Sequence, residues 1–223
     1  MAKIREMAAP YLCGQRLQEG MTMTTWKNVW TDRELLVRGA VSLLGLIAAV
    51  YAYGPFLARV ELRRGVAFVD PVHILFAPID LTWITFTMVY GAGLAAAALL
   101  LRRPASLMWA MQAYTLHVVF RMMMMWALPL DPPATMIPLT DPVASAFTGA
   151  GAPLTRDLFY SGHVGTLVVL SMVLPQQWAR RVLAAMSVAL GVVLIAQHVH
   201  YTVDVLVAPF VAAAAARLTR TSA

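Results

Sequence analysis

Six long apolar stretches separated by short polar segments dominate the pattern of this chain. They predict helices over residues 35–57, 80–101, 105–128, 161–175, 182–198 and 201–218. An apolar helix of about 17–25 residues spans a hydrocarbon core about 30 Å thick. The pattern therefore predicts an all-α, polytopic membrane protein with six transmembrane helices.

The polar segments between these stretches define the expected domain organisation. Residues 1–30 are polar and mixed in composition, and predict a cytosolic N-terminal segment, whereas residues 31–223 are expected to form the six-helix membrane domain. Thr31 and Glu34 have the spacing of a capping box that would start the first helix. Residues 129–160 make the longest loop, and a long loop in a compact protein is usually functional or disordered.

The composition agrees with a membrane protein and excludes several classes. Of all residues, 60% are hydrophobic and 13% are charged, whereas a soluble domain is about 45–50% apolar and about 25% charged. The net charge of +6 comes from basic residues at the ends of apolar stretches, without an aromatic-interleaved basic patch, so nucleic acid is not an expected partner. Cys13 is the only cysteine, which excludes an intrachain disulfide and a cysteine-based metal site. The sequence carries no signature of the oligomeric state.

The distribution of basic residues predicts the orientation in the membrane. If residues 1–38 are cytoplasmic, twelve basic residues lie inside and five, from Arg59 to Arg156, lie outside or near that face. This bias follows the positive-inside rule. Seven of the eleven acidic residues then collect at the outer ends of the helices. The compact, Ala- and Arg-rich chain suggests a bacterial inner membrane protein with a periplasm-facing site.

A first polar motif, Asp157-Leu-Phe-Tyr-Ser-Gly-His163, lies at the edge of the fourth apolar stretch. Charged groups are costly within membrane helices, so those found there are candidates for function. Ser161 is a favoured N-cap, and the free amides of a helix N-terminus bind phosphate. Gly162 would let a phosphate approach the backbone, and His163 could donate or accept a proton beside it.

A second polar motif, His200-Tyr-Thr-Val-Asp204, begins the sixth apolar stretch. Residues four apart on a helix share one face, so Asp204 could hold one ring nitrogen of His200 and leave the other free. A nucleophile or base is supported in this way by a third group. In the alternative interpretation, His200 lies at the membrane interface and Asp204 merely caps the helix, although Asp204 lies inside an apolar run. Together the motifs predict phosphoryl-transfer chemistry at the outer ends of helices four to six.

Both motifs resemble those of the sphingomyelin synthase branch of the lipid phosphate phosphatase (PAP2) superfamily. That branch has Gly-Asp-x-x-x-Ser-Gly-His-Thr and His-Tyr-Thr-x-Asp-Val, and this chain departs from the first at Arg156 and Val164. The second is preceded here by His198. Looser matches are Pro78-Ile-Asp80 and the stretch containing Tyr114 and Arg121. The Lys-x6-Arg-Pro and Ser-Arg-x5-His-x3-Asp motifs of the broader phosphatases are not present.

The resemblance implies a double displacement on a membrane lipid, with no cofactor and no metal. His200 would attack the phosphorus of a glycerophospholipid and form a phosphohistidine, with Asp204 orienting it. His163 would protonate the departing diacylglycerol and then act as base for ceramide or a related, diacylglycerol-like lipid alcohol. The further residues expected to bind substrate or phosphate are Ser161, Gly162, Asp157, Arg121, Arg156, His198, Tyr201 and Asp80.

Two other functions remain open at this stage. The first is a hydrolase that uses water as the acceptor, either a phospholipase C or a lipid phosphate phosphatase. The second is a lipid-binding or translocating protein with an inactive site. Outside the expected site, His117 is expected to hydrogen-bond to a neighbouring helix, and His73 lies in the polar connection 58–79. Met122 to Met125 are expected to give adaptable packing, with an acyl-chain path as a second interpretation.

Overall fold

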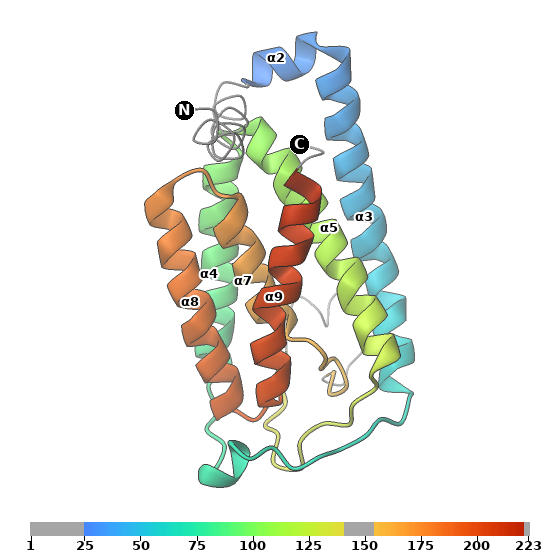
Figure 1. The fold of residues 1–223 in the computed structure, drawn as a ribbon, viewed down its shortest axis with the longest axis vertical. Helices are drawn as coiled ribbons and strands as arrows, with labels where there is room; N and C mark the ends of the chain where they lie inside the picture. The colour runs from blue at the N-terminus through green and yellow to red at the C-terminus, as the bar shows by residue number, and fades with distance from the viewer. Residues whose placement is uncertain (1–24, 141–153, 221–223) are drawn as a thin grey trace, which may run out of the picture.

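The computed structural model describes residues 25–140 and 154–220, which form a bundle of α-helices (Figure 1). The bundle confirms the predicted all-α class, and each apolar stretch corresponds to one helix. Within the described residues the α-helices are α2 (Trp26–Thr31), α3 (Arg33–Glu61), α4 (Thr82–Leu100), α5 (Pro104–Ala127), α7 (Gly162–Val173), α8 (Gln177–Ala196) and α9 (Thr202–Thr219). A 3₁₀ turn, η1 (His73–Leu75), lies in the connection between α3 and α4.

Four of the described helices, α3, α4, α8 and α9, are long and apolar enough to cross a membrane. In the most apolar part of α3 only 6% of the residues are buried, so most of its apolar side chains face outward. Large exposed apolar surfaces mark contact with protein or membrane. These helices are compatible with an integral membrane protein.

The helices α5 and α7 lie at the centre of the bundle. The helix α5 packs against α3, α7 and α9, and α7 packs against α4, α8 and α9 (Figure 1). Small residues at these contacts, among them Ala113, Ala208 and Ala212, are fully buried. Small side chains let the backbones of neighbouring membrane helices approach closely.

The start of α3 differs from the predicted capping box. Thr31 is the last residue of α2, and Asp32 is the N-cap, with its side chain accepting a hydrogen bond from the Glu34 amide at 2.8 Å. Aspartate is as good an N-cap as serine and better than threonine. The predicted box was therefore wrong by one residue, because the chain turns at Asp32.

Most of the described carboxylates and most of the described basic residues lie at opposite ends of the bundle. Alternation of helix direction brings the basic residues around Arg33, Arg102, Arg180 and Arg217 to the end where α2 lies (Figure 1). The opposite end, called the acidic end below, holds the described carboxylates Glu61, Asp70, Asp80, Asp131, Asp157 and Asp204. Asp141 lies outside the described residues. Which end faces the cytoplasm stays a prediction.

The segment 154–161 enters the bundle from the acidic end before α7 begins. Its last residues, Tyr160 and Ser161, are fully buried. Backbone that is not helical is tolerated at membrane depth where it is buried in protein. The segment also explains why α7 has only 12 residues, since this part of the path through the bundle is not helical.

Candidate active site

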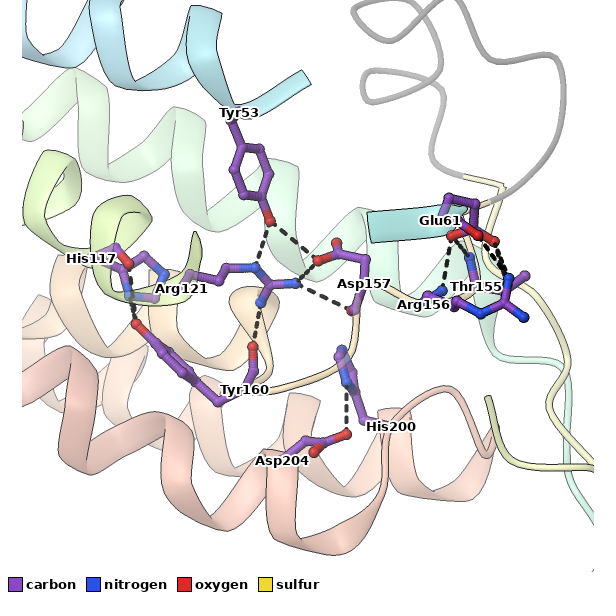
Figure 2. Close-up of polar contacts among 10 residues, drawn as sticks. All are labelled: Tyr53, Glu61, His117, Arg121, Thr155, Arg156, Asp157, Tyr160, His200 and Asp204. Atoms are coloured by element: carbon purple, nitrogen blue, oxygen red, sulfur yellow. Dashed lines mark hydrogen bonds and ion pairs between the residues drawn. The ribbon is translucent and has the colours of Figure 1, made fainter. Parts of the chain in front are cut away.

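His200 and Asp204 lie together at the N-terminus of α9 (Figure 2). Nδ1 of His200 is 3.4 Å from Oδ2 of Asp204, and the two side chains are 2% and 0% exposed. The helix begins only at Thr202, so the pair does not occupy successive turns of one helix, as the spacing predicted. Instead, Asp204 reaches back to the helix start, where its Oδ2 accepts a hydrogen bond from the Tyr201 amide at 3.0 Å. A carboxylate in the first turn is also favoured by the helix dipole.

His163 faces His200 from the first turn of α7. The two ring centroids are 6.4 Å apart, with an angle of 66° between the ring planes. The backbone holds the two helix starts together, because the Ser161 amide donates a hydrogen bond to the Asp204 carbonyl at 3.1 Å. The structure thus brings the three expected catalytic side chains to one place.

Ser161 occupies the N-cap position of α7 but does not cap the helix with its side chain. Among the described residues its hydroxyl has no hydrogen-bond partner, although Ser161 is fully buried. The expected capping bond was therefore wrong, and this buried hydroxyl is unpaired within the part of the chain that the structure describes. The first amides of any helix lack partners within the helix, and helix N-termini in general can bind phosphate.

Arg121 of α5 is buried beside the start of α7 (Figure 2). Its Nε donates to the Tyr53 hydroxyl at 2.6 Å, Nη1 donates to the Tyr160 carbonyl, and Nη2 forms an ion pair with the Asp157 carboxylate. Tyr53 in turn donates to Asp157 at 3.2 Å. Tyr53, Arg121 and Asp157 thus form one polar network that joins α3, α5 and the buried segment.

Gly162 is required by this network. A Cβ atom at Gly162 would lie 2.3 Å from Nη1 of Arg121, which is well inside contact distance. The glycine therefore admits the guanidinium of Arg121. Sequence reasoning assigned Gly162 to the approach of a phosphate and did not identify Tyr53, because a single tyrosine in an apolar helix carries no recognisable signal.

His117 of α5 packs against Gly165, which lies about one turn after the start of α7. Its Nδ1 is 3.0 Å from the Tyr160 hydroxyl, and a Cβ atom at Gly165 would lie 2.3 Å from its Cε1. The expected hydrogen bond of His117 is confirmed, although its partner belongs to the segment before α7 and not to a helix.

Arg156 lies in a second polar cluster, away from His200 (Figure 2). Its Nε donates to the Asp131 carboxylate at 2.7 Å, and its Nη1 donates to the Glu61 carbonyl at 2.8 Å. The Glu61 carboxylate accepts from the amides of Thr155 and Arg156, each at 3.0 Å. The hydrogen bond from Arg156 holds the pKa of Asp131 below its usual range. The structure does not bring Arg156 to the histidines, and its contacts join the end of α3 to the segment before α7.

The remaining expected residues are His198, Tyr201 and Asp80. His198 and Tyr201 flank His200 and stack against His73 and Phe68. Asp80 is exposed and accepts a hydrogen bond from the Thr82 amide at 3.0 Å, at the start of α4. Within residues 25–140 and 154–220, no three side chains of His, Cys, Asp or Glu are grouped as a metal site requires.

The family model for the PAP2 superfamily C-terminal domain matches residues 156–221. The match supports membership of the PAP2 superfamily. It includes His163, His200 and Asp204, whereas Tyr53 and Arg121 lie outside it. Members of this superfamily are phosphatases and phosphotransferases, which is consistent with an enzyme. Comparisons with curated proteins and with solved structures gave no match.

Proposed function

We propose that this protein is a lipid headgroup phosphotransferase, which moves a phosphoalcohol from a glycerophospholipid to ceramide or a related lipid alcohol. The observation that supports this most directly is the placement of the His163 and His200 rings 6.4 Å apart between centroids, with Asp204 beside Nδ1 of His200. The proposal includes six membrane-spanning helices, with the acidic end facing the periplasm of a bacterial cell.

In the first half of the reaction, Nε2 of His200 attacks the phosphorus, because Nδ1 faces Asp204. The bond from phosphorus to the diacylglycerol oxygen breaks, and His163 gives its proton to that oxygen. The products are free diacylglycerol and a phosphohistidine that carries the headgroup phosphate. Asp204 stabilises the positive charge that develops on the His200 ring.

In the second half, His163 takes the proton of the acceptor hydroxyl. The acceptor oxygen attacks phosphorus, the nitrogen–phosphorus bond breaks, and His200 returns to its starting state. Water in place of the lipid alcohol gives hydrolysis through the same groups, and the test below distinguishes the two acceptors.

The charges near the site favour a phosphodiester over a phosphomonoester. The guanidinium of Arg121 is paired with Asp157, and Asp204 adds a further negative charge. A phosphodiester carries one negative charge, whereas a monoester carries about 1.5 to 2 at neutral pH. A site with little unpaired positive charge suits the lower charge. This supports headgroup transfer over a lipid phosphate phosphatase.

An apolar groove beside the site supports a lipid substrate. The groove lies between α5 and α9, has a volume of about 600 Å³, and is lined by Met123 and Met124 of α5, Phe210 and Ala214 of α9, and Phe159 among others. Phe159 belongs to the buried segment that leads to the site. Ligand sites are typically apolar and of about 300–1,000 Å³, so the groove suits an acyl chain of the donor, in agreement with the acyl-chain interpretation of the methionines.

The decisive test is product analysis by mass spectrometry. Purified wild type and His200→Ala, reconstituted with mixed glycerophospholipids, would be compared with and without ceramide. The proposal expects a ceramide phosphoalcohol and diacylglycerol from the wild type alone. If the products are diacylglycerol and free phosphoalcohol, and ceramide does not change them, the protein is a phospholipase C and the transferase proposal fails. If the only product is inorganic phosphate, released from an added lipid phosphate monoester, the protein is a phosphatase and the transferase proposal fails.

A further inference from the structure

The connection between α3 and α4, residues 62–81, runs along the acidic end of the bundle (Figure 1). It contacts the turn between α8 and α9, which carries His200. The Ile79 amide donates to the Ala196 carbonyl at 3.0 Å, and the Leu81 amide donates to the Gln197 side chain at 3.2 Å. A segment expected only as a polar connection is therefore bound to the turn that carries the proposed nucleophile.

Asp70 makes the central contact of this connection. Asp70 is only 4% exposed. Its carboxylate accepts hydrogen bonds from the backbone amide of Thr202 and, at 3.1 Å, from the Thr202 hydroxyl. It also accepts from the Val72 amide at 2.9 Å. Since Thr202 is the first residue of α9, Asp70 binds the start of that helix from a position 132 residues away in the chain.

Two carboxylates thus bind consecutive amides directly after His200. Asp204 accepts from the Tyr201 amide, and Asp70 accepts from the Thr202 amide. Both amides belong to the helix start, where partners within the helix are lacking and negative charge is favoured. The position of Asp204 relative to His200 therefore depends on a helix start that Asp70 stabilises.

Aromatic rings of the same connection stack on one residue that precedes His200 and one residue that follows it. His73 stacks on His198, with ring centroids 4.0 Å apart and 12° between planes. Phe68 stacks on Tyr201, also at 4.0 Å, with 19° between planes. The turn is thus held on either side of the nucleophile.

His198 shows that the turn needs such support. Its φ of 56° lies in the left-handed region, which is uncommon for residues other than glycine. Conformations of this kind persist where the surrounding structure determines them. Here the His73 stack and the 2.6 Å contact between Nδ1 of His198 and the Thr135 hydroxyl supply those contacts.

We propose that Asp70 is a positioning residue for His200, a role that rests on the proposed function. Asp70 does not touch the reacting atoms. By holding the Thr202 amide and hydroxyl, it keeps the first turn of α9 formed, so that Asp204 stays beside Nδ1 of His200. Without this carboxylate the helix start opens, and Asp204 no longer orients the nucleophile.

The test compares Asp70→Asn with Asp32→Asn in the full-length protein in lipid nanodiscs. Asp32 is a matched control, because it also binds a backbone amide at a helix start, that of Glu34 at 2.8 Å, but at the opposite end of the bundle. Misplacement of reacting groups lowers rates by about 10- to 100-fold. We expect kcat for diacylglycerol release to fall by that factor in Asp70→Asn, with KM changed by less than about twofold, and no change in Asp32→Asn.

Hydrogen exchange gives a second readout that does not need activity. In Asp70→Asn, the amides of residues 200–204 should exchange at least about 10-fold faster than in wild type, while the rest of the bundle keeps its protection. Unchanged exchange there, or an unchanged kcat, would overturn the proposal. If wild type releases no diacylglycerol, the proposed function fails while the exchange result still tests the support of the helix start.

A milder variant guards against global misfolding. Thr202→Val removes the 3.1 Å bond to Asp70 and keeps the backbone bond. If Asp70→Asn loses protection throughout the bundle, a lower kcat with faster exchange confined to residues 200–204 in Thr202→Val supports the proposal. Wild-type kcat and exchange in Thr202→Val would then overturn it.

Discussion

The backbone amide of Ser161 donates a hydrogen bond to the carbonyl of Asp204 at 3.1 Å. This bond joins the start of α7 to the first turn of α9, and these two helix starts carry His163 and His200. The two motifs of the sequence are therefore connected through backbone as well as through facing side chains. The two joined helix starts thus keep His163 and His200 in register.

The close approach of Arg121 to Gly162 predicts that Gly162→Ala is destabilising. The new methyl group would overlap Nη1 of Arg121, 2.3 Å away, and displace the guanidinium from Asp157. Overpacking costs about 1–3 kcal/mol, so the thermal midpoint of unfolding in detergent should fall and activity should fall with it. Gly93→Ala in α4 is the control, since a Cβ there meets no atom within 4 Å. It should be neutral or stabilising by up to about 1 kcal/mol; equal effects of the two variants would contradict the packing argument.

The ion pair of Arg121 and Asp157 predicts strongly non-additive mutations. Removing one partner of a fully buried pair costs about 3–5 kcal/mol, because the other charge is left uncompensated; the Asp157 side chain is 23% exposed, so a smaller loss is expected here. Arg121→Gln and Asp157→Asn should each lower the stability of the bundle, and the double variant should lose clearly less than the sum. Denaturant unfolding of wild type, both single variants and the double variant measures this coupling. Additive losses would show that the pair contributes little.

The buried carboxylate of Asp70 predicts that the folded state loses stability at acidic pH. Burial alone would raise the pKa of Asp70, but the hydrogen bonds from Thr202 and Val72 outweigh it and lower that pKa below the usual value. The folded protein then binds this proton less readily than the unfolded chain, so the ionised carboxylate stabilises the folded state at neutral pH. This contribution is lost as the pH falls below about 4, through the lowered pKa of the folded state.

The corresponding measurement is the thermal midpoint of wild type and Asp70→Asn as a function of pH. The gap between the two proteins should be constant near neutral pH and should narrow in the acidic range. A gap that does not change down to about pH 3 would mean that the charge of Asp70 does not stabilise the fold.

The apolar groove predicts a chain-length effect on substrate use. Ala214→Trp would fill the groove between α5 and α9, and should raise KM for long-chain donors by about 10-fold, equivalent to about 1.4 kcal/mol of lost binding. Short-chain donors should be affected less, because they bury fewer methylene groups. Val188→Trp is the control, since Val188 is 70% exposed on α8, away from the groove. The same change in KM in both variants would show that the groove does not bind the substrate.

The sequence by itself determined the helices and the three central side chains. Apolar stretches of membrane-spanning length predict helices through local composition alone, and all six were found, with ends shifted by a few residues. His163, His200 and Asp204 were recognisable because charged and titratable groups are rare in such a chain. Their meeting in space followed from both motifs lying at the same end of the bundle.

The tertiary structure decided which groups surround these three. Tyr53 and Asp157 are 104 residues apart, and Asp70 and Thr202 are 132 residues apart, so neither contact has a local signature. The same holds for Gly162, whose role depends on where α5 places Arg121, and for Arg156, which Glu61 and Asp131 bind away from the histidines. Helix formation depends on neighbours along the chain, whereas the partner of a buried polar group is set by which helices pack together.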